Sequence, residues 1–78
     1  METTTLDPAS VIVRMPEAIG ITGLSRATIY RRISSDKTFP KPVQLSDSDA
    51  RGAPIGFVLG ELQAWVEKRK EARSNAAA

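Results

Sequence analysis

The sequence contains neither cysteine nor histidine in its 78 residues. The absence of cysteine excludes a disulfide framework, and the absence of both residue types excludes a zinc finger. Without histidine the chain also lacks the side chain that most often serves as a general base near neutral pH. The remaining side chains form no set of nucleophile, base and orienting group. We therefore predict that the protein is not an enzyme and that it holds no metal and no cofactor.

Long apolar runs are absent too. No stretch approaches the roughly 20 apolar residues that a membrane-spanning helix requires. The N-terminus lacks a basic patch followed by an apolar core, so we expect no signal peptide. The lack of cysteine fits a reducing compartment, and we expect a cytoplasmic protein that does not contact membranes. A chain of this length makes a single domain with a thin core and no deep pocket.

The positive charge is modest overall but unevenly distributed. The formal net charge is only +2, which is weak evidence for a nucleic-acid partner. Between Ser25 and Leu45, however, Asp36 is the single acidic residue, and it stands among five basic ones: Arg26, Arg31, Arg32, Lys37 and Lys41. Such a cluster is the electrostatic footprint of a surface that binds phosphates. A solvated helix face without a ligand is the alternative interpretation.

Two short helices are predicted at this basic cluster. Pro16 suits the first position of the first helix, where its missing N–H costs nothing, and Gly23 can adopt the left-handed conformation that ends it. Ser25 is a favourable N-cap for the second helix, because its hydroxyl can accept from the N–H of Ala27 or Thr28. Two helices joined in this way predict a helix-turn-helix.

The second predicted helix, Ser25–Ser34, has two distinct sides. Ile29 and Ile33 mark its buried side, and Leu24 packs at the turn before it. Ala27 and Arg31 then point roughly opposite to the isoleucines, toward solvent. In a DNA-binding helix-turn-helix the second helix lies in the major groove. We therefore predict that this exposed side meets DNA.

After this helix the pattern becomes extended. Apolar residues alternate over residues 43–45 and again over residues 55–57, which predicts a two-stranded hairpin with a long polar tip. Beside a helix-turn-helix such a hairpin is called a wing. The tip sequence Asp47-Ser48-Asp49 begins like a calcium-binding loop. The twelfth position of that loop is Val58, however, and not the bidentate glutamate that calcium needs, so we predict no metal there.

Core residues and domain limits follow from the same patterns. We expect Phe39 to be a buried anchor, with the buried stripe of a C-terminal helix formed by Leu62, Trp65 and Val66. Gly60 occupies the expected N-cap position of that helix, and residues 11–13 either form a short strand or pack on the core. We predict a folded domain over residues 11–71, between a flexible arm (residues 1–10) and a flexible tail (residues 72–78).

Five short motifs follow one another along the chain: Arg14-Met15-Pro16-Glu17, Thr22-Gly23-Leu24-Ser25, Thr28-Ile29-Tyr30-Arg31-Arg32-Ile33, Phe39-Pro40-Lys41-Pro42-Val43 and Glu61-Leu62-Gln63-Ala64-Trp65. Together they resemble the AlpA family of small regulators associated with phages and genomic islands. That family belongs to the MerR-like winged-helix proteins, which include many excisionases. The resemblance covers roughly residues 13–69. It implies a DNA-binding protein of the α+β class, a small winged helix-turn-helix with two short helices, a β-hairpin wing and a C-terminal helix.

By position, the resemblance assigns DNA contacts to two parts of the chain: Ser25, Arg26, Ala27, Thr28, Tyr30, Arg31 and Arg32 on the second helix and its flanks, and Lys41 and Arg51 along the wing. The chain departs from the family at Ala27, where serine is usual, and at Phe57, where tryptophan is frequent. Its wing tip is also longer and more acidic than usual, and aspartates repel phosphate. We therefore expect stronger contacts from the helix than from the wing.

The arginines of the second helix are expected to have different roles. Arg31 is the best candidate for a base contact, because a guanidinium can bind guanine O6 and N7 together. Arg26 and Arg32 are expected to hold phosphates, which position the helix without reading sequence. Thr28 either contacts DNA or bonds back toward Ser25.

The neighbouring residues have less specific expectations. Ala27 either touches a thymine methyl or is small to permit close approach. Tyr30 is expected to lie half in the core with its hydroxyl free for a phosphate. Lys37 and Lys41 are expected to contact the DNA backbone, and solvated lysines without a ligand are the alternative.

The sequence thus predicts sequence-specific binding of double-stranded DNA by a transcriptional regulator of a prophage or integrative element, located with the nucleoid in the cytoplasm. One such module grips only part of a duplex turn, so we expect a dimer or several copies on repeated sites. Two other functions stay open. One is an excisionase that bends DNA and recruits an integrase. The other is a protein-interaction module or antirepressor that does not bind DNA.

Overall fold

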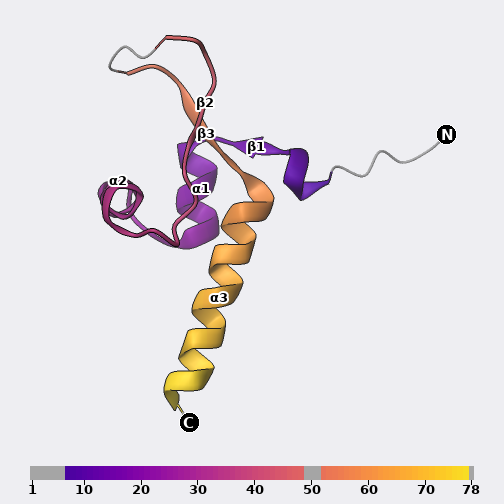
Figure 1. The fold of residues 1–78 in the computed structure, drawn as a ribbon, viewed down its shortest axis with the longest axis vertical. Helices are drawn as coiled ribbons and strands as arrows, with labels where there is room; N and C mark the ends of the chain where they lie inside the picture. The colour runs from indigo at the N-terminus through magenta and orange to yellow at the C-terminus, as the bar shows by residue number, and fades with distance from the viewer. Residues whose placement is uncertain (1–6, 49–51, 78) are drawn as a thin grey trace, which may run out of the picture.

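The computed structural model describes residues 7–48 and 52–77. It contains three α-helices, α1 (Met15–Thr22), α2 (Arg26–Ser35) and α3 (Leu59–Ala77), with a short 3-10 helix, η1 (Pro8–Ser10), before them. Three strands, β1 (Ile12–Val13), β2 (Val43–Gln44) and β3 (Ile55–Val58), form an antiparallel sheet in the order β1-β3-β2. The arrangement confirms the predicted α+β winged helix-turn-helix (Figure 1).

The turn between α1 and α2 forms as the sequence predicts. Gly23 has φ 74°, and its N–H donates to the Ile19 carbonyl at 2.8 Å, which ends α1. A side chain at this φ is strained, so glycine is the favoured residue. The Ser25 hydroxyl then accepts from the N–H of Thr28 at 3.2 Å and caps α2. These two local contacts set where each helix of the pair ends and begins.

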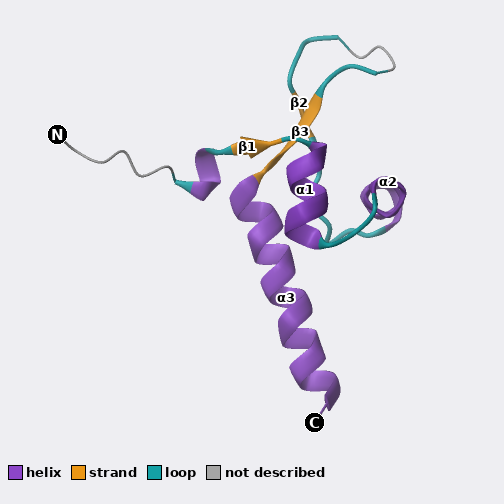
Figure 2. Ribbon diagram, turned by 180° about the vertical axis from the view of Figure 1, so that it is seen from behind, coloured by secondary structure: helices purple, strands orange, loops and turns teal. Residues whose placement is uncertain are grey.

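The wing is the hairpin of β2 and β3, in which Val43 pairs with Gly56 and Gln44 with Ile55. β1 joins the other edge of β3 and pairs Val13 with Phe57. The open alternative for residues 11–13 is therefore resolved in favour of a strand. α2 and the described part of the wing project to one side of α1, and β1 and η1 lie on the other side (Figures 1 and 2).

The core lies where α1, α2, β3 and α3 meet, and it contains Met15, Ala18, Ile29, Phe39, Phe57, Leu62 and Trp65. The Phe39 ring packs edge-on against Phe57 and Trp65, with ring centroids 6.4 and 5.0 Å apart. Phe39 is 1% exposed and Trp65 is 7% exposed. The predicted anchor and the predicted stripe of the C-terminal helix are both confirmed. Ile33 is partly buried against the same core.

The prediction for Gly60 is wrong. α3 begins at Leu59, so Gly60 lies inside the first turn of the helix and does not cap it. A Cβ on Gly60 would lie 3.3 Å from the Ala9 nitrogen and from the Pro8 carbonyl carbon. The glycine therefore allows η1 to pack closely on the start of α3.

Helical structure extends beyond the predicted domain limits at both ends of the chain, as η1 before residue 11 and as α3 after residue 71. Residues 7–10, placed by the sequence in the arm, form η1 and its cap, with the Ala9 N–H donating to Asp7 Oδ1 at 3.0 Å. The N–H of Leu59 donates to the Val11 carbonyl at 2.8 Å and ties this segment to α3. At the other end, helical backbone continues to Ala77, beyond the expected limit at residue 71. Within the described ranges, no helix has the length and apolar character needed to cross a membrane.

Candidate nucleic-acid interface

The outer side of α2 is open to solvent, as its periodicity predicts. Ile29 is fully buried, whereas Arg26, Ala27, Arg31 and Arg32 are all exposed. The helix therefore buries one side in the core and presents arginines on the other. This is the arrangement that a recognition helix requires.

A chain of hydrogen bonds runs along the first turn of α2. The Ser25 hydroxyl donates to Thr28 Oγ1 at 2.9 Å, and the Arg31 guanidinium donates to the same oxygen at 3.4 Å. Thr28 thus bonds back to Ser25, which is one of the two roles that the sequence predicts for it. The long contact with Thr28 leaves most of the five N–H donors of Arg31 free for a ligand.

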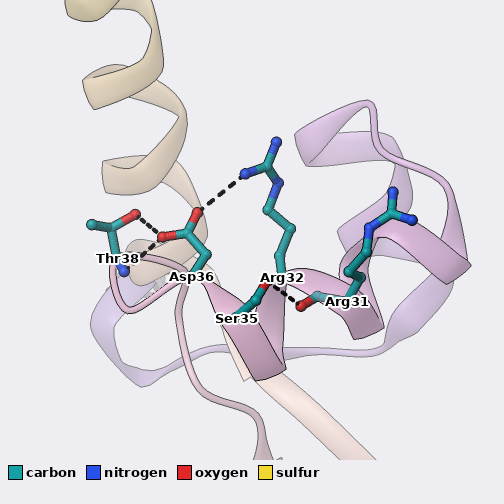
Figure 3. Close-up of polar contacts among 5 residues, drawn as sticks. All are labelled: Arg31, Arg32, Ser35, Asp36 and Thr38. Carbon is teal, nitrogen blue, oxygen red and sulfur yellow. Dashed lines mark hydrogen bonds and ion pairs between the residues drawn. The ribbon is translucent and has the colours of Figure 1, made fainter.

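Arg32 lies nearer the C-terminal end of α2 and pairs with Asp36. Its Nη1 is 3.4 Å from Asp36 Oδ2, and Figure 3 shows Arg31 extending away from this pair. The other oxygen of Asp36 accepts from the Thr38 hydroxyl at 2.6 Å and from its N–H at 2.9 Å. These hydrogen bonds from Thr38, with a smaller contribution from the Arg32 guanidinium, hold the pKa of Asp36 below its ordinary value. Asp36 therefore stays ionised and orients Arg32.

An open groove of about 620 Å³ separates α2 from the base of the wing. We call it the α2–wing groove, and its polar and apolar lining includes Arg14, Glu17, Arg26, Tyr30, Pro54 and Ile55. Arg26 and Tyr30 reach it from α2, and Tyr30 is 46% exposed. The structure thus brings two of the predicted contact residues together with an arginine that the site prediction did not include.

That additional residue is Arg14, the N-cap of α1. Its Nε donates to the Ile55 carbonyl at 2.9 Å, and its backbone N–H donates to Glu17 Oε1 at 3.0 Å. In the sequence, its only signal is its place in the first of the five family motifs. Since Arg14 and Ile55 are 41 residues apart in the chain, no local pattern indicates that they meet.

Lys37 and Lys41 lie in a different groove, of about 570 Å³, between α3 and the segment that leads from α2 to β2. We call it the α3 groove; Glu61 and Lys68 line its α3 side, and the core rings of Phe39 and Trp65 form part of its wall. Lys41 Nζ also donates to the Ile33 carbonyl at 3.3 Å, near the end of α2. The structure therefore separates the two predicted lysines from the α2–wing groove.

The wing tip is only partly described. Asp47 is exposed, and Asp49 and Arg51, the latter a predicted contact residue, lie outside the described residues. In the described part of the chain, no three side chains of the metal-binding types come together.

These features define a small winged helix-turn-helix protein in which the second helix presents arginines to solvent. Residues 11–70 match the family described as prophage CP4-57 regulatory protein (AlpA), and the chain belongs to this family. It is 33% identical over 63 residues to the DNA-binding transcriptional activator AlpA of Escherichia coli (strain K12), which covers 74% of this chain and 83% of that protein. No solved structure gives a significant match. The comparisons confirm the family that the five motifs indicate.

Proposed function

We propose that the protein is a regulator of transcription that binds specific sequences of double-stranded DNA and belongs to a prophage or integrative element. The observation that carries this proposal is the solvent-facing side of α2, where Arg31 stands opposite the fully buried Ile29 and the exposed Arg26 flanks it. The relative from E. coli, which is named as a DNA-binding transcriptional activator, supports it. Location with the nucleoid follows from DNA binding.

In this proposal α2 enters the major groove and Arg31 reads a base. A guanidinium can donate to guanine O6 and N7 together, a pairing worth about 1–3 kcal/mol of discrimination. The neighbouring Ala27 has no bulk to hold the helix away from the base edges. Ser25 and Thr28 bond to each other at the helix start. We therefore propose that they mainly shape this surface and that their polar contacts with DNA are secondary.

Phosphate contacts come from residues on either side of this reading face. Arg26 and Arg32 flank it on α2, and Lys37 and Lys41 follow α2 in the chain. Arg51 is the proposed wing contact. Contacts of this kind fix the register of the helix on the duplex without carrying sequence information.

The test begins with selection of bound duplexes from a random pool, which gives the preferred sequence. If four of these five residues hold phosphates, log K should fall against log salt with a slope of about −3.6. On a panel of mutated sites, Arg31→Ala should lose preference at one base position, whereas Arg26→Ala should weaken all sites alike. The role of Arg31 is wrong if both variants lose affinity uniformly across the panel.

The same DNA separates the remaining functions. A footprint that extends over repeated sites is expected, because one module covers only part of a duplex turn. Strong bending in a gel next to an attachment site, with binding of an integrase, would instead indicate an excisionase. Absence of salt-sensitive binding to any duplex at low salt would indicate a protein-interaction module.

A further inference from the structure

We propose that the α2–wing groove is a binding site for one phosphodiester of the DNA backbone, with Arg14 as its fixed anchor. This inference rests on the proposed function, because it assumes that α2 lies in the major groove. It adds a contact from a residue at the start of α1, outside both the recognition helix and the wing.

The structure holds Arg14 in place through one of its donors. The Nε–H is used on the Ile55 carbonyl at 2.9 Å, and the terminal nitrogens have no hydrogen-bond acceptor among the described residues. A guanidinium has five N–H donors in a planar fork, and two parallel donors match two phosphate oxygens. Fixing Nε therefore leaves an oriented pair of donors, whose ordering cost is already met by the contact with Ile55.

The opposite wall of the groove supplies a second cation and a hydroxyl. Arg26 and Tyr30 are one helical turn apart on α2, so they share a face of that helix. Neither side chain forms an ion pair or a hydrogen bond within the described residues. Three side chains with free donor groups thus line one open groove from the start of α1 and from α2.

Among the described residues of this lining Glu17 is the one acidic side chain, and it accepts from the backbone N–H of Arg14. Two guanidinium groups against one carboxylate give the described lining a formal charge of +1. A site with this balance attracts an anion.

The shape of the groove favours a DNA strand over a small enclosed ligand. It is open, and it lies between the element proposed to enter the major groove and the base of the wing. A duplex that receives α2 in its major groove places the backbone of one strand beside that helix. The wall formed by Pro54 and Ile55 then lies on the far side of that strand.

The test uses the full chain and a duplex of random sequence, with affinity measured over a range of salt. Arg14→Gln keeps an amide donor for the Ile55 carbonyl but removes the charge. We expect its salt slope to be less steep than that of wild type by about 0.9. If the two proteins bind equally at 1 M salt, the variant should therefore bind about eightfold more weakly than wild type at 0.1 M salt. Arg14→Lys should keep the wild-type slope. Arg69→Gln, on the exposed part of α3, is the matched control and should also keep it.

The outcomes separate the two levels of the proposal. If wild type shows no salt-dependent binding, the proposed function fails. If wild type binds DNA in a salt-dependent way and Arg26→Ala weakens all sites alike, but Arg14→Gln keeps the wild-type slope, this inference is overturned and the proposed function stands.

A second measurement does not depend on how the variants fold. In the ¹⁵N-labelled wild-type protein, the terminal N–H signals of Arg14 should shift and slow their exchange when the duplex is added. Signals that do not change in a saturated complex would overturn the inference.

Discussion

The α2–wing groove and the α3 groove are similar in size, at about 620 and 570 Å³, but they are built differently. The described lining of the first includes exposed guanidinium groups and a half-exposed tyrosine. The second has flexible lysines over the core rings of Phe39 and Trp65. From the proposed function we expect substitutions in the first groove to change DNA binding, whereas substitutions in the wall of the second should change stability.

The largest effect on stability is expected when a core ring in the wall of the α3 groove is replaced by alanine. Phe39 is 1% exposed and packs on two aromatic rings, so Phe39→Ala should lower the free energy of unfolding by about 3–5 kcal/mol. The matched truncation in the other groove, Tyr30→Ala, should lower it by only about 1 kcal/mol, because Tyr30 is 46% exposed. Urea denaturation measures both values. Equal losses in the two variants would break the contrast between the grooves.

The next effect concerns the close approach of strands at the base of the wing. A Cβ on Gly56 would overlap Ile12 Cγ2 and lie 3.1 Å from the Val13 carbonyl oxygen. Gly56→Ala should therefore cost about 1–3 kcal/mol of stability through overpacking.

The matched control for Gly56 is Gly20, inside α1, where a Cβ would meet nothing within 4 Å. Gly20→Ala should stabilise the protein by about 0.5–1 kcal/mol, because alanine loses less entropy in a helix. Thermal unfolding of both variants tests the sign of each effect. If Gly20→Ala also destabilises the protein, the space around each glycine does not decide the effect of adding a methyl group.

The parts of the fold that the sequence predicts are those set by near neighbours in the chain. The Gly23 turn, the Ser25 cap and the isoleucine spacing of α2 depend on residues within about one helical turn. Burial of Phe39 and Trp65 follows from apolar pattern alone. These features are the ones that the structure confirms.

The parts that the sequence does not predict depend on contacts between distant segments. From the sequence Gly60 looks like a weak N-cap. Only the close packing of η1 explains why glycine, with no side chain, stands at this position. The bond from Arg14 to Ile55 and the position of Lys68 on the same groove as Lys37 likewise require the folded sheet and α3. Charge clustering along the chain therefore locates α2, but it does not separate the two grooves.

A smaller effect is expected from Asp36, whose turn leads from α2 into the α3 groove. Hydrogen bonds from Thr38 and the nearby Arg32 lower its pKa in the folded protein. The stability that this carboxylate contributes is therefore present above its unfolded pKa of about 3.8 and lost as the pH falls through the lower folded pKa. Asp36→Asn should lower Tm at pH 7 and reduce the further loss of Tm between pH 5 and pH 3.

The matched control for removing one carboxylate is Asp47→Asn, in the exposed wing. Melting curves of both variants and wild type at pH 7, 5 and 3 provide the comparison. If Asp36→Asn loses as much Tm in acid as wild type, the bonds from Thr38 do not contribute to acid sensitivity.

The smallest effect is expected at Lys68, on the α3 side of the α3 groove. α3 runs from the sheet away from the wing, whereas α2 and the wing project together on one side of α1 (Figure 1). In the proposed complex, a duplex seated on α2 and the wing would have its backbone beside Arg14 and Arg26, and α3 would carry Lys68 away from it. Lys68→Ala should change affinity for random duplex by less than twofold and leave the salt slope unaltered, whereas Lys37→Ala should make the slope less steep by at most about 0.9. Since Glu61 already offsets one of the lysine charges in this groove, a steep loss in Lys68→Ala would mean that DNA extends along α3 and that both grooves bind it.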